Sequence, residues 1–195
     1  MHHPVKKNVL VPIANGTEEI ETMCIVDTLR RADVNVTLAS IYHKSSNLPI
    51  IKGSRDISIV CDNYLENVIN KDYDMIALPG GAQNAEELSG CHILIDKLQK
   101  QKEAMKWYAA ICASPALVFQ PHGLLDGHEG TCYPSFESKL KNKSKASHRV
   151  VVSKNCITSQ GPGTALEFAL MLVEKLVSVD KAAQLAKGML AYIPK

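Results

Sequence analysis

Short apolar segments with strand character alternate with amphipathic helical segments along most of this chain of 195 residues. Because parallel strands need long crossover connections, this alternation predicts an α/β sandwich with a mainly parallel sheet. The expected strands cover residues 8–14, 34–41, 73–78 and 106–111, with hairpins over 49–60 and 149–159 and a short strand at 130–133. The expected helices cover residues 17–31, 86–102, 113–120 and 165–176, with a last helix that begins near 179.

The bulk composition indicates one globular domain over residues 1–195. Hydrophobic residues make up 46% of the chain, which is enough for a full core. We expect residues 1–7 to be a disordered N-terminal segment or an addition from cloning, because they contain no apolar run. The formal net charge of +2 argues against sequence-specific nucleic-acid binding and against an anionic membrane surface.

The six cysteines are scattered and none forms a Cys-x-x-Cys pair, so no metal site is predicted. No segment has the length and apolar character of a signal peptide or a membrane span. We therefore expect a cytoplasmic protein with reduced thiols.

Cys112 lies where an apolar strand-like run changes into an Ala- and Leu-rich helix-like run. By itself such a residue is typical of a buried packing cysteine. A strand-to-helix turn, however, holds a side chain at the carboxyl edge of a sheet, and a helix N-terminus there favours a thiolate.

Two other expected strand ends carry residues that suit a reactive cysteine. Gly80 and Gly81 follow the strand at 73–78, and their amides, with that of Ala113, are candidates for an oxyanion pocket. Glu21 lies one turn into the first helix on the side of Ile25, so it is expected to face inward. Burial would keep its carboxyl protonated, able to hydrogen-bond the cysteine sulfur, to lower the thiol pKa and to move protons.

Six motifs in one order carry a resemblance to the ThiJ/PfpI superfamily, in the branch of the Parkinson-disease-associated protein deglycase. They span nearly the whole chain, and their order is more specific than any one of them. The motifs are Gly-Thr-Glu-Glu-Ile-Glu (16–21), Val-Asp-Thr-Leu-Arg-Arg-Ala (26–32), Gly-Ser-Arg-Asp (53–56), Leu-Pro-Gly-Gly (78–81), Ala-Ala-Ile-Cys-Ala (109–113) and Thr-Ser-Gln-Gly-Pro-Gly-Thr (158–164).

The resemblance implies a flavodoxin-like fold, a reactive cysteine at Cys112 and a buried glutamate at Glu21 that contacts its sulfur. It also implies a homodimer with the first helix near the contact, no cofactor, and family arginines at Arg31 and Arg55 that line the approach to the cysteine. Tyr133 stands where animal members carry a histidine near the cysteine, and Ala113 stands where intracellular peptidases carry one. We expect the remaining candidates, His122 and His128, to be exposed, which leaves acid–base work to Glu21.

The function that this implies is cofactor-free glyoxalase chemistry or deglycase-type repair, with a role in oxidative-stress protection. The substrates would be a small α-oxoaldehyde such as methylglyoxal, or early glyoxal adducts on proteins. The alternative is a non-enzymatic redox-sensing chaperone that acts through oxidation of Cys112. A third alternative, a hydrolase or peptidase, needs a histidine base within reach of Cys112.

Overall fold

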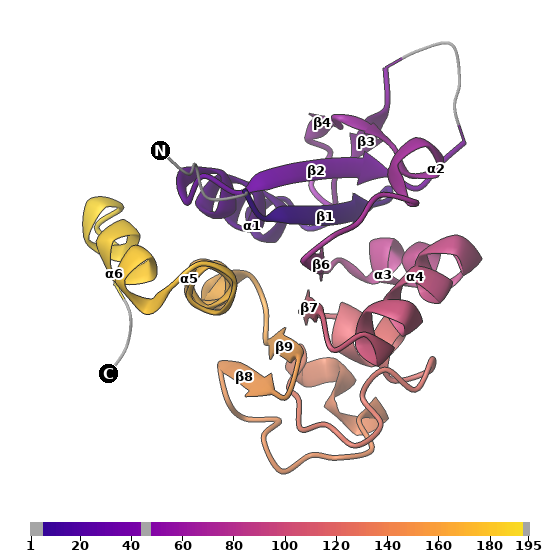
Figure 1. Ribbon diagram of the computed structural model, residues 1–195. Coiled ribbons are helices and arrows are strands. Elements are labelled where there is room, and N and C mark those ends of the chain that lie inside the picture. Colours follow the sequence, from indigo (N-terminus) through magenta and orange to yellow (C-terminus); the bar gives the residue numbers. More distant parts are fainter. Residues whose placement is uncertain (1–5, 44–47, 193–195) are drawn as a thin grey trace.

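The computed structural model describes residues 6–43 and 48–192, and these residues form a flavodoxin-like α/β sandwich (Figure 1). The central sheet has seven strands in the order β5-β2-β1-β6-β7-β9-β8, and β3 and β4 form a separate antiparallel hairpin. The strands are β1 (Asn8–Ile13), β2 (Asn35–Ser40), β3 (Ile50–Lys52), β4 (Ser58–Val60), β5 (Asn63–Tyr64), β6 (Met75–Leu78), β7 (Trp107–Ile111), β8 (Val150–Ser153) and β9 (Cys156–Ser159).

Every strand pair of the central sheet is parallel except the edge pair β8–β9, whose turn is too short for a crossover. The inner strands β1, β6 and β7 are almost fully buried, as expected for a parallel sheet covered on both faces. The helices are α1 (Glu19–Arg31), α2 (Leu65–Val68), α3 (Ala82–Ser89), α4 (His92–Glu103), α5 (Ala165–Leu176) and α6 (Val179–Gly188).

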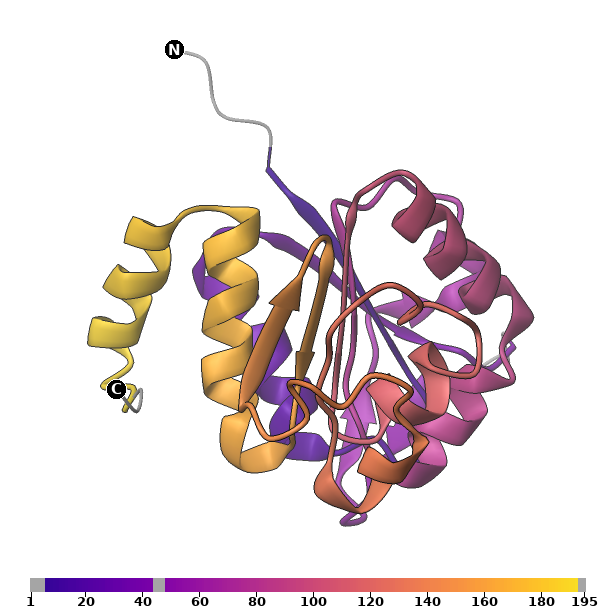
Figure 2. The ribbon, with the colours of Figure 1, turned by 90° about the horizontal axis from the view of Figure 1, so that it is seen from below.

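Helices cover both faces of the sheet (Figure 2). On one face α1 packs against α5, and α5 in turn packs against α6. On the other face lie α3 and α4, and α3 packs against the short helical turn Pro115–Phe119. The strands and helices expected from the sequence are therefore largely confirmed, and the parallel sheet with them.

Three local expectations are wrong. The helix expected over 86–102 is two helices, because Gly90 ends α3 and Cys91 has the extended backbone that begins α4. No strand forms at 130–133, where the backbone instead bonds to loops and side chains. The helix expected over 113–120 is a single wide turn, in which the Gln120 N–H donates to the Pro115 carbonyl five residues back.

Candidate active site

The carboxyl ends of β1, β6 and β7 lie side by side, because β6 pairs with both of its neighbours in parallel. β1 leads to Glu21, β6 leads to Gly80, and β7 leads to Cys112. Strand order also reverses here, since the chain passes from β1 to β2 on one side and later to β6 on the other. Open α/β sheets bind ligands at such a switch point, so the topology brings the three predicted elements to one edge.

Glu21 faces inward from α1, as its spacing from Ile25 predicts, and its side chain is fully buried. The side chain of Glu18 caps this helix by accepting the Glu21 N–H at 2.8 Å. The cap fixes the first turn of α1, and with it the position of the Glu21 carboxyl.

The Glu21 carboxyl bridges the other two strand ends. Its Oε2 atom accepts the Gly80 N–H at 2.7 Å, and the carboxyl also interacts with the Cys112 thiol. Its Oε1 atom makes no hydrogen bond of normal geometry to a described residue. Burial raises the Glu21 pKa to about 8, against the lowering effect of the Gly80 N–H. The carboxyl therefore carries a proton over much of the neutral pH range.

Cys112 occupies the sharp turn after β7 with a left-handed backbone, at φ 66°. Its side chain is buried, with 8% exposed. Its N–H donates to the Ser159 carbonyl at 3.0 Å, and its own carbonyl accepts the Tyr133 N–H at 2.8 Å. Two neighbouring segments thus hold a non-glycine residue in a conformation that costs it energy, as is common at functional sites.

The expectation that a helix N-terminus lowers the Cys112 pKa is wrong. Burial and the adjacent Glu21 raise the pKa of the thiol to about 12, while the Gly81 and Ala113 N–H groups act in the lowering direction. The repulsion from Glu21 requires an ionised carboxyl and ends when that carboxyl takes up a proton. The two groups thus titrate as one acid pair, and when the pair has lost one proton, the remaining proton lies on either the oxygen or the sulfur.

The glycine turn after β6 is required by close packing. A Cβ on Gly80 would contact the Cys112 Cβ and would lie 2.6 Å from Glu21 Oε2 and 3.0 Å from Cys112 Sγ. Gly81 has φ 91°, and a Cβ there would collide with the Gly16 carbonyl. Of the three amides predicted for an oxyanion pocket, those of Gly81 and Ala113 reach the thiol, whereas that of Gly80 is bound to Glu21.

Within this chain, the side chains of the two arginines that are predicted to line the pocket are bonded to groups other than Cys112. Arg31 forms an exposed ion pair with Asp27 at 2.6 Å, and it lies ten residues beyond Glu21, about 15 Å along α1. The Arg55 guanidinium donates to the Ser54 carbonyl, while its backbone N–H donates to Glu19 Oε1. Arg55 thus fixes the start of α1 through its backbone.

Tyr133 is next to Cys112 through its backbone bond, and its ring is 43% exposed. The ring lies over Gly161, where an added Cβ would be 3.1 Å from it, and beside Phe136. Tyr133 is thus bonded to the Cys112 backbone, while its ring packs on the Gly161 turn, and its place in the approach to the thiol stays a prediction.

The expectation that His122 and His128 are exposed is wrong for His128, which is buried, and His122 is half-buried. The His128 ring bonds to the Ser153 carbonyl at 2.9 Å and to the Tyr108 hydroxyl at 3.1 Å. His122 bonds to Ser89. Both rings are thus held by groups away from Cys112, and sequence reasoning missed the His128 network because its partners are far apart in the chain.

All six cysteines are free thiols, and the described residues contain no cluster of His, Cys, Asp and Glu that could hold a metal ion. No helix within residues 6–43 and 48–192 is long and apolar enough to cross a bilayer.

Comparisons with known proteins identify the family and the fold of this chain. A model of the DJ-1/PfpI family matches residues 7–175. Protein DJ-1 homolog A from Arabidopsis thaliana is 47% identical over 182 residues, which are 93% of this chain but 45% of the plant protein, so the chain spans about half the length of that relative. Glutathione-independent glyoxalase DJR-1.2 from Caenorhabditis elegans is 34% identical over 92% of each chain. The structure of oxidized Toxoplasma gondii DJ-1 matches with a TM-score of 0.90 and 41% identity, over 95% of this chain and all of that one.

Proposed function

Since the chain belongs to the DJ-1/PfpI family, we propose that it is a glutathione-independent glyoxalase or deglycase that acts through Cys112. The observation that supports this proposal most directly is the contact of the buried Glu21 carboxyl with both the Gly80 N–H and the Cys112 thiol. The proposed substrates are methylglyoxal or early glyoxal adducts on proteins. A similar worm protein is named a glutathione-independent glyoxalase, which supports this class of reaction.

In the first step, the Cys112 sulfur attacks the aldehyde carbon of the α-oxoaldehyde while the thiol proton passes to Glu21. A pKa near the working pH suits a group that both takes up and releases protons, and burial gives Glu21 such a value, about 8. The Gly81 and Ala113 amides stabilise the alkoxide that forms. Glu21 then returns the proton to that oxygen, which completes the hemithioacetal.

In the second step, the Glu21 carboxylate removes the hydrogen from the former aldehyde carbon and delivers it to the neighbouring carbon through an enediol. The hydroxyl proton passes from the first oxygen to the second. The first carbon is thereby oxidised to a thioester, and the second is reduced to an alcohol. Water then cleaves the carbon–sulfur bond, which releases the hydroxy acid and restores the thiol.

Methylglyoxal loss and lactate formation can be followed by NMR in chelator-treated buffer without added thiols. We expect Cys112→Ala and Glu21→Gln each to lose at least about 100-fold in kcat/KM, because both residues take part in bond-making steps. Cys91→Ala is the matched control, since Cys91 is a half-buried cysteine at the start of α4, and it should retain wild-type turnover. Full activity in Cys112→Ala or in Glu21→Gln would refute the proposal.

The second candidate function is redox sensing coupled to chaperone activity, in a role of oxidative-stress protection. The supporting observation is that the same carboxyl and the same two amides surround the Cys112 sulfur, where they could hold the oxygens of a sulfinate. Peroxide titration with mass spectrometry separates this candidate from simple oxidation damage. Oxidation of Cys24 or Cys91 before Cys112 would count against it, because those two thiols are more exposed.

We also propose that the protein is a homodimer formed through α1 and β4. Large apolar side chains are exposed on this surface, namely Ile20, Met23 and Ile57 at 56%, 42% and 56%. Met23 and Ile57 line a groove of 360 Å³, together with Val26 and Ile59. Met23→Glu should give a monomer by sedimentation, and Ile93→Glu on α4 is the control that should not. Equal masses for the two variants would reject the assignment of this surface.

A cytoplasmic location is the remaining part of the proposal. Six free thiols suit a reducing compartment. Labelling of the protein in fractionated cells would test the location directly, and recovery in an oxidising compartment would contradict it.

A further inference from the structure

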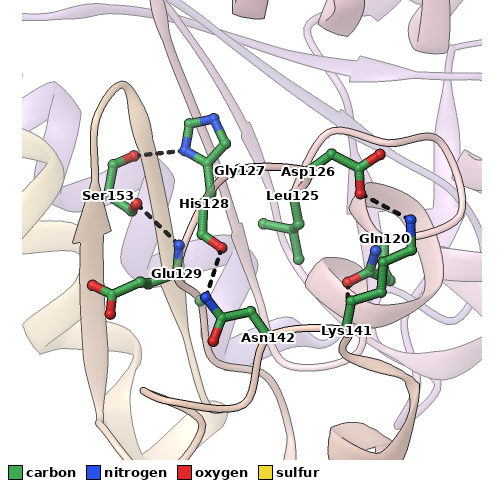
Figure 3. Close-up of a pocket in the computed structure, with 10 residues that line it drawn as sticks. Gln120, Leu125, Asp126, Gly127, His128, Glu129, Lys141, Asn142 and Ser153 are labelled. Carbon is green, nitrogen blue, oxygen red and sulfur yellow. Dashed lines mark hydrogen bonds and ion pairs between the residues drawn. The ribbon is translucent and has the colours of Figure 1, made fainter.

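A second cavity lies away from Cys112, between the loop at 120–130 and the basic segment 139–145 (Figure 3). Its volume is 440 Å³, within the usual range for small-molecule sites. The proposed glyoxalase chemistry uses none of its residues. The side chains that matter below are Gln120, Leu125, Asp126, Lys141 and Asn142.

Gln120 lines this cavity, and its side chain holds an unused, buried hydrogen-bond donor. The side chain is 8% exposed, and its Oε1 atom accepts the Lys141 backbone N–H at 3.0 Å. The Lys141 N–H fixes the orientation of the Gln120 amide, because a flipped amide would place its NH₂ group against that N–H. Nε2 therefore points away from the Lys141 backbone, and it has no hydrogen-bond partner among the described residues. A buried unpaired donor costs free energy that an acceptor oxygen on a ligand would recover.

Lysines dominate the charge around the cavity. Lys141 Nζ lies 2.9 Å from Asp126 Oδ1, and together they form the wall beside Gln120 (Figure 3). Lys102 Nζ donates to the Gly123 and Asp126 carbonyls, and Lys154 Nζ lies 3.6 Å from the position of a Cβ on Gly127. Three ammonium groups thus stand near two carboxylates, those of Asp126 and Glu129, and the net positive charge favours an anionic ligand.

Glu129 and His128, which also line the cavity, do not cancel the positive charge of the lysines. The Glu129 side chain extends away from Leu125 and Gln120 in Figure 3, and its Oε1 accepts the Ser144 hydroxyl. The His128 ring is occupied by Ser153 and Tyr108. Leu125 supplies an apolar surface, and the Asn142 amide bonds to the His128 carbonyl at the rim.

We propose that this pocket binds a small hydroxylated carboxylate, such as a sugar acid. The carboxylate accepts hydrogen bonds from Gln120 Nε2 and from Lys141 Nζ, which keeps two protons beyond its bond to Asp126. Hydroxyls of the ligand donate to Asp126, and its carbon chain lies on Leu125. A hydroxylated ligand fits better than a purely apolar acid, because the walls alternate donors and acceptors.

Gluconate is the probe, and glucose and sorbitol are its uncharged counterparts of similar size. We expect gluconate to bind the wild-type protein with a Kd on the order of 1 mM by NMR titration, with shifts centred on residues 120–130 and 141–142. Lys141→Ala should weaken binding at least about fivefold, and Gln120→Glu should do the same while keeping the acceptor for the Lys141 N–H. Lys143→Ala is the matched control in the same exposed segment and should bind as the wild type does.

Any one of four results would overturn the proposal. The first three are equal binding of glucose or sorbitol, equal and competing binding of inorganic phosphate, and gluconate shifts that centre on Cys112. The fourth is unchanged binding in both Lys141→Ala and Gln120→Glu. Cys112→Ala should bind gluconate as the wild type does, so failure of the glyoxalase proposal and failure of this one give different results.

Discussion

The two ends of β7 carry buried polar clusters that differ in one respect. Near its start, the Tyr108 hydroxyl donates to the Leu124 carbonyl at 2.8 Å and meets His128, whose other ring nitrogen bonds to Ser153. At its end, Cys112 and Glu21 share a site in which Glu21 Oε1 lacks a hydrogen bond. A satisfied network rigidifies a fold, whereas an unsatisfied acid pair retains reactivity. The structural cluster, at Tyr108, and the chemical cluster, at Cys112, are thus only four residues apart in the sequence.

Gly80→Ala should break the chemical cluster with the largest effect. The new Cβ would enter the space of Cys112 and of Glu21 Oε2, so the carboxyl must move away from the sulfur. We expect a loss of about 100-fold or more in methylglyoxal turnover, since misplacement of catalytic groups by about 1 Å has effects of this size. Gly90→Ala, at an open helix end, is the control and should leave turnover unchanged. Retained activity in Gly80→Ala would show that the contact is unimportant.

Glu21→Gln should stabilise the protein at alkaline pH. Burial raises the folded-state pKa of Glu21 from 4.5 to about 8, so the unfolded chain loses this proton first as pH rises. The wild type therefore loses stability between about pH 4.5 and pH 8, at up to about 1.4 kcal/mol per pH unit, and the neutral amide does not. Urea unfolding at pH 4.5 and pH 8 measures the difference. Glu103→Gln, at an exposed position, keeps Glu21 and should lose stability with rising pH as the wild type does, and equal pH dependence in the two variants would remove the explanation.

Tyr108→Phe should harm the structural cluster and spare the chemical one. Loss of the hydroxyl leaves the Leu124 carbonyl and His128 Nε2 short of a partner, at a cost of about 1–3 kcal/mol. Chemical denaturation measures that loss, and methylglyoxal turnover should stay within about twofold of wild type. Tyr192→Phe, 87% exposed, is the control. A large fall in turnover at unchanged stability would mean that the two clusters are coupled.

The pH dependence of kcat/KM for methylglyoxal should give the smallest of these effects. Turnover requires the Cys112–Glu21 pair to lose one proton, and burial raises the Glu21 pKa to about 8. We expect kcat/KM to rise about tenfold between pH 7 and pH 9 and then to level off. A profile that is already flat from pH 6 would show that the pair loses its proton well below pH 7.

The comparison also shows which part of the site can be predicted from sequence. Glu21 and Cys112 are found because helical spacing and a strand-to-helix change are local patterns. The His128 network is not, because Tyr108, Leu124 and Ser153 meet only through the sheet. The pKa of Cys112 was predicted in the wrong direction, since the following residues form one wide turn and burial dominates over any helix dipole.

The fold is more predictable than the site because its signals repeat. Each inner strand has its own apolar run, and an error in one leaves the others intact. The split between α3 and α4 escaped prediction because an apolar face continues across Gly90, and only the backbone of Cys91 interrupts it.

The left-handed backbone of Cys112 has a consequence for which substitutions this position accepts. Glycine adopts φ 66° without a steric penalty, so Cys112→Gly would relax the turn at the expense of the thiol. A lineage that no longer needed the chemistry would gain conformational freedom by that single replacement. The side chain at this turn therefore costs the folded state a steric penalty that glycine would not pay, and what the chain has in return is the thiol.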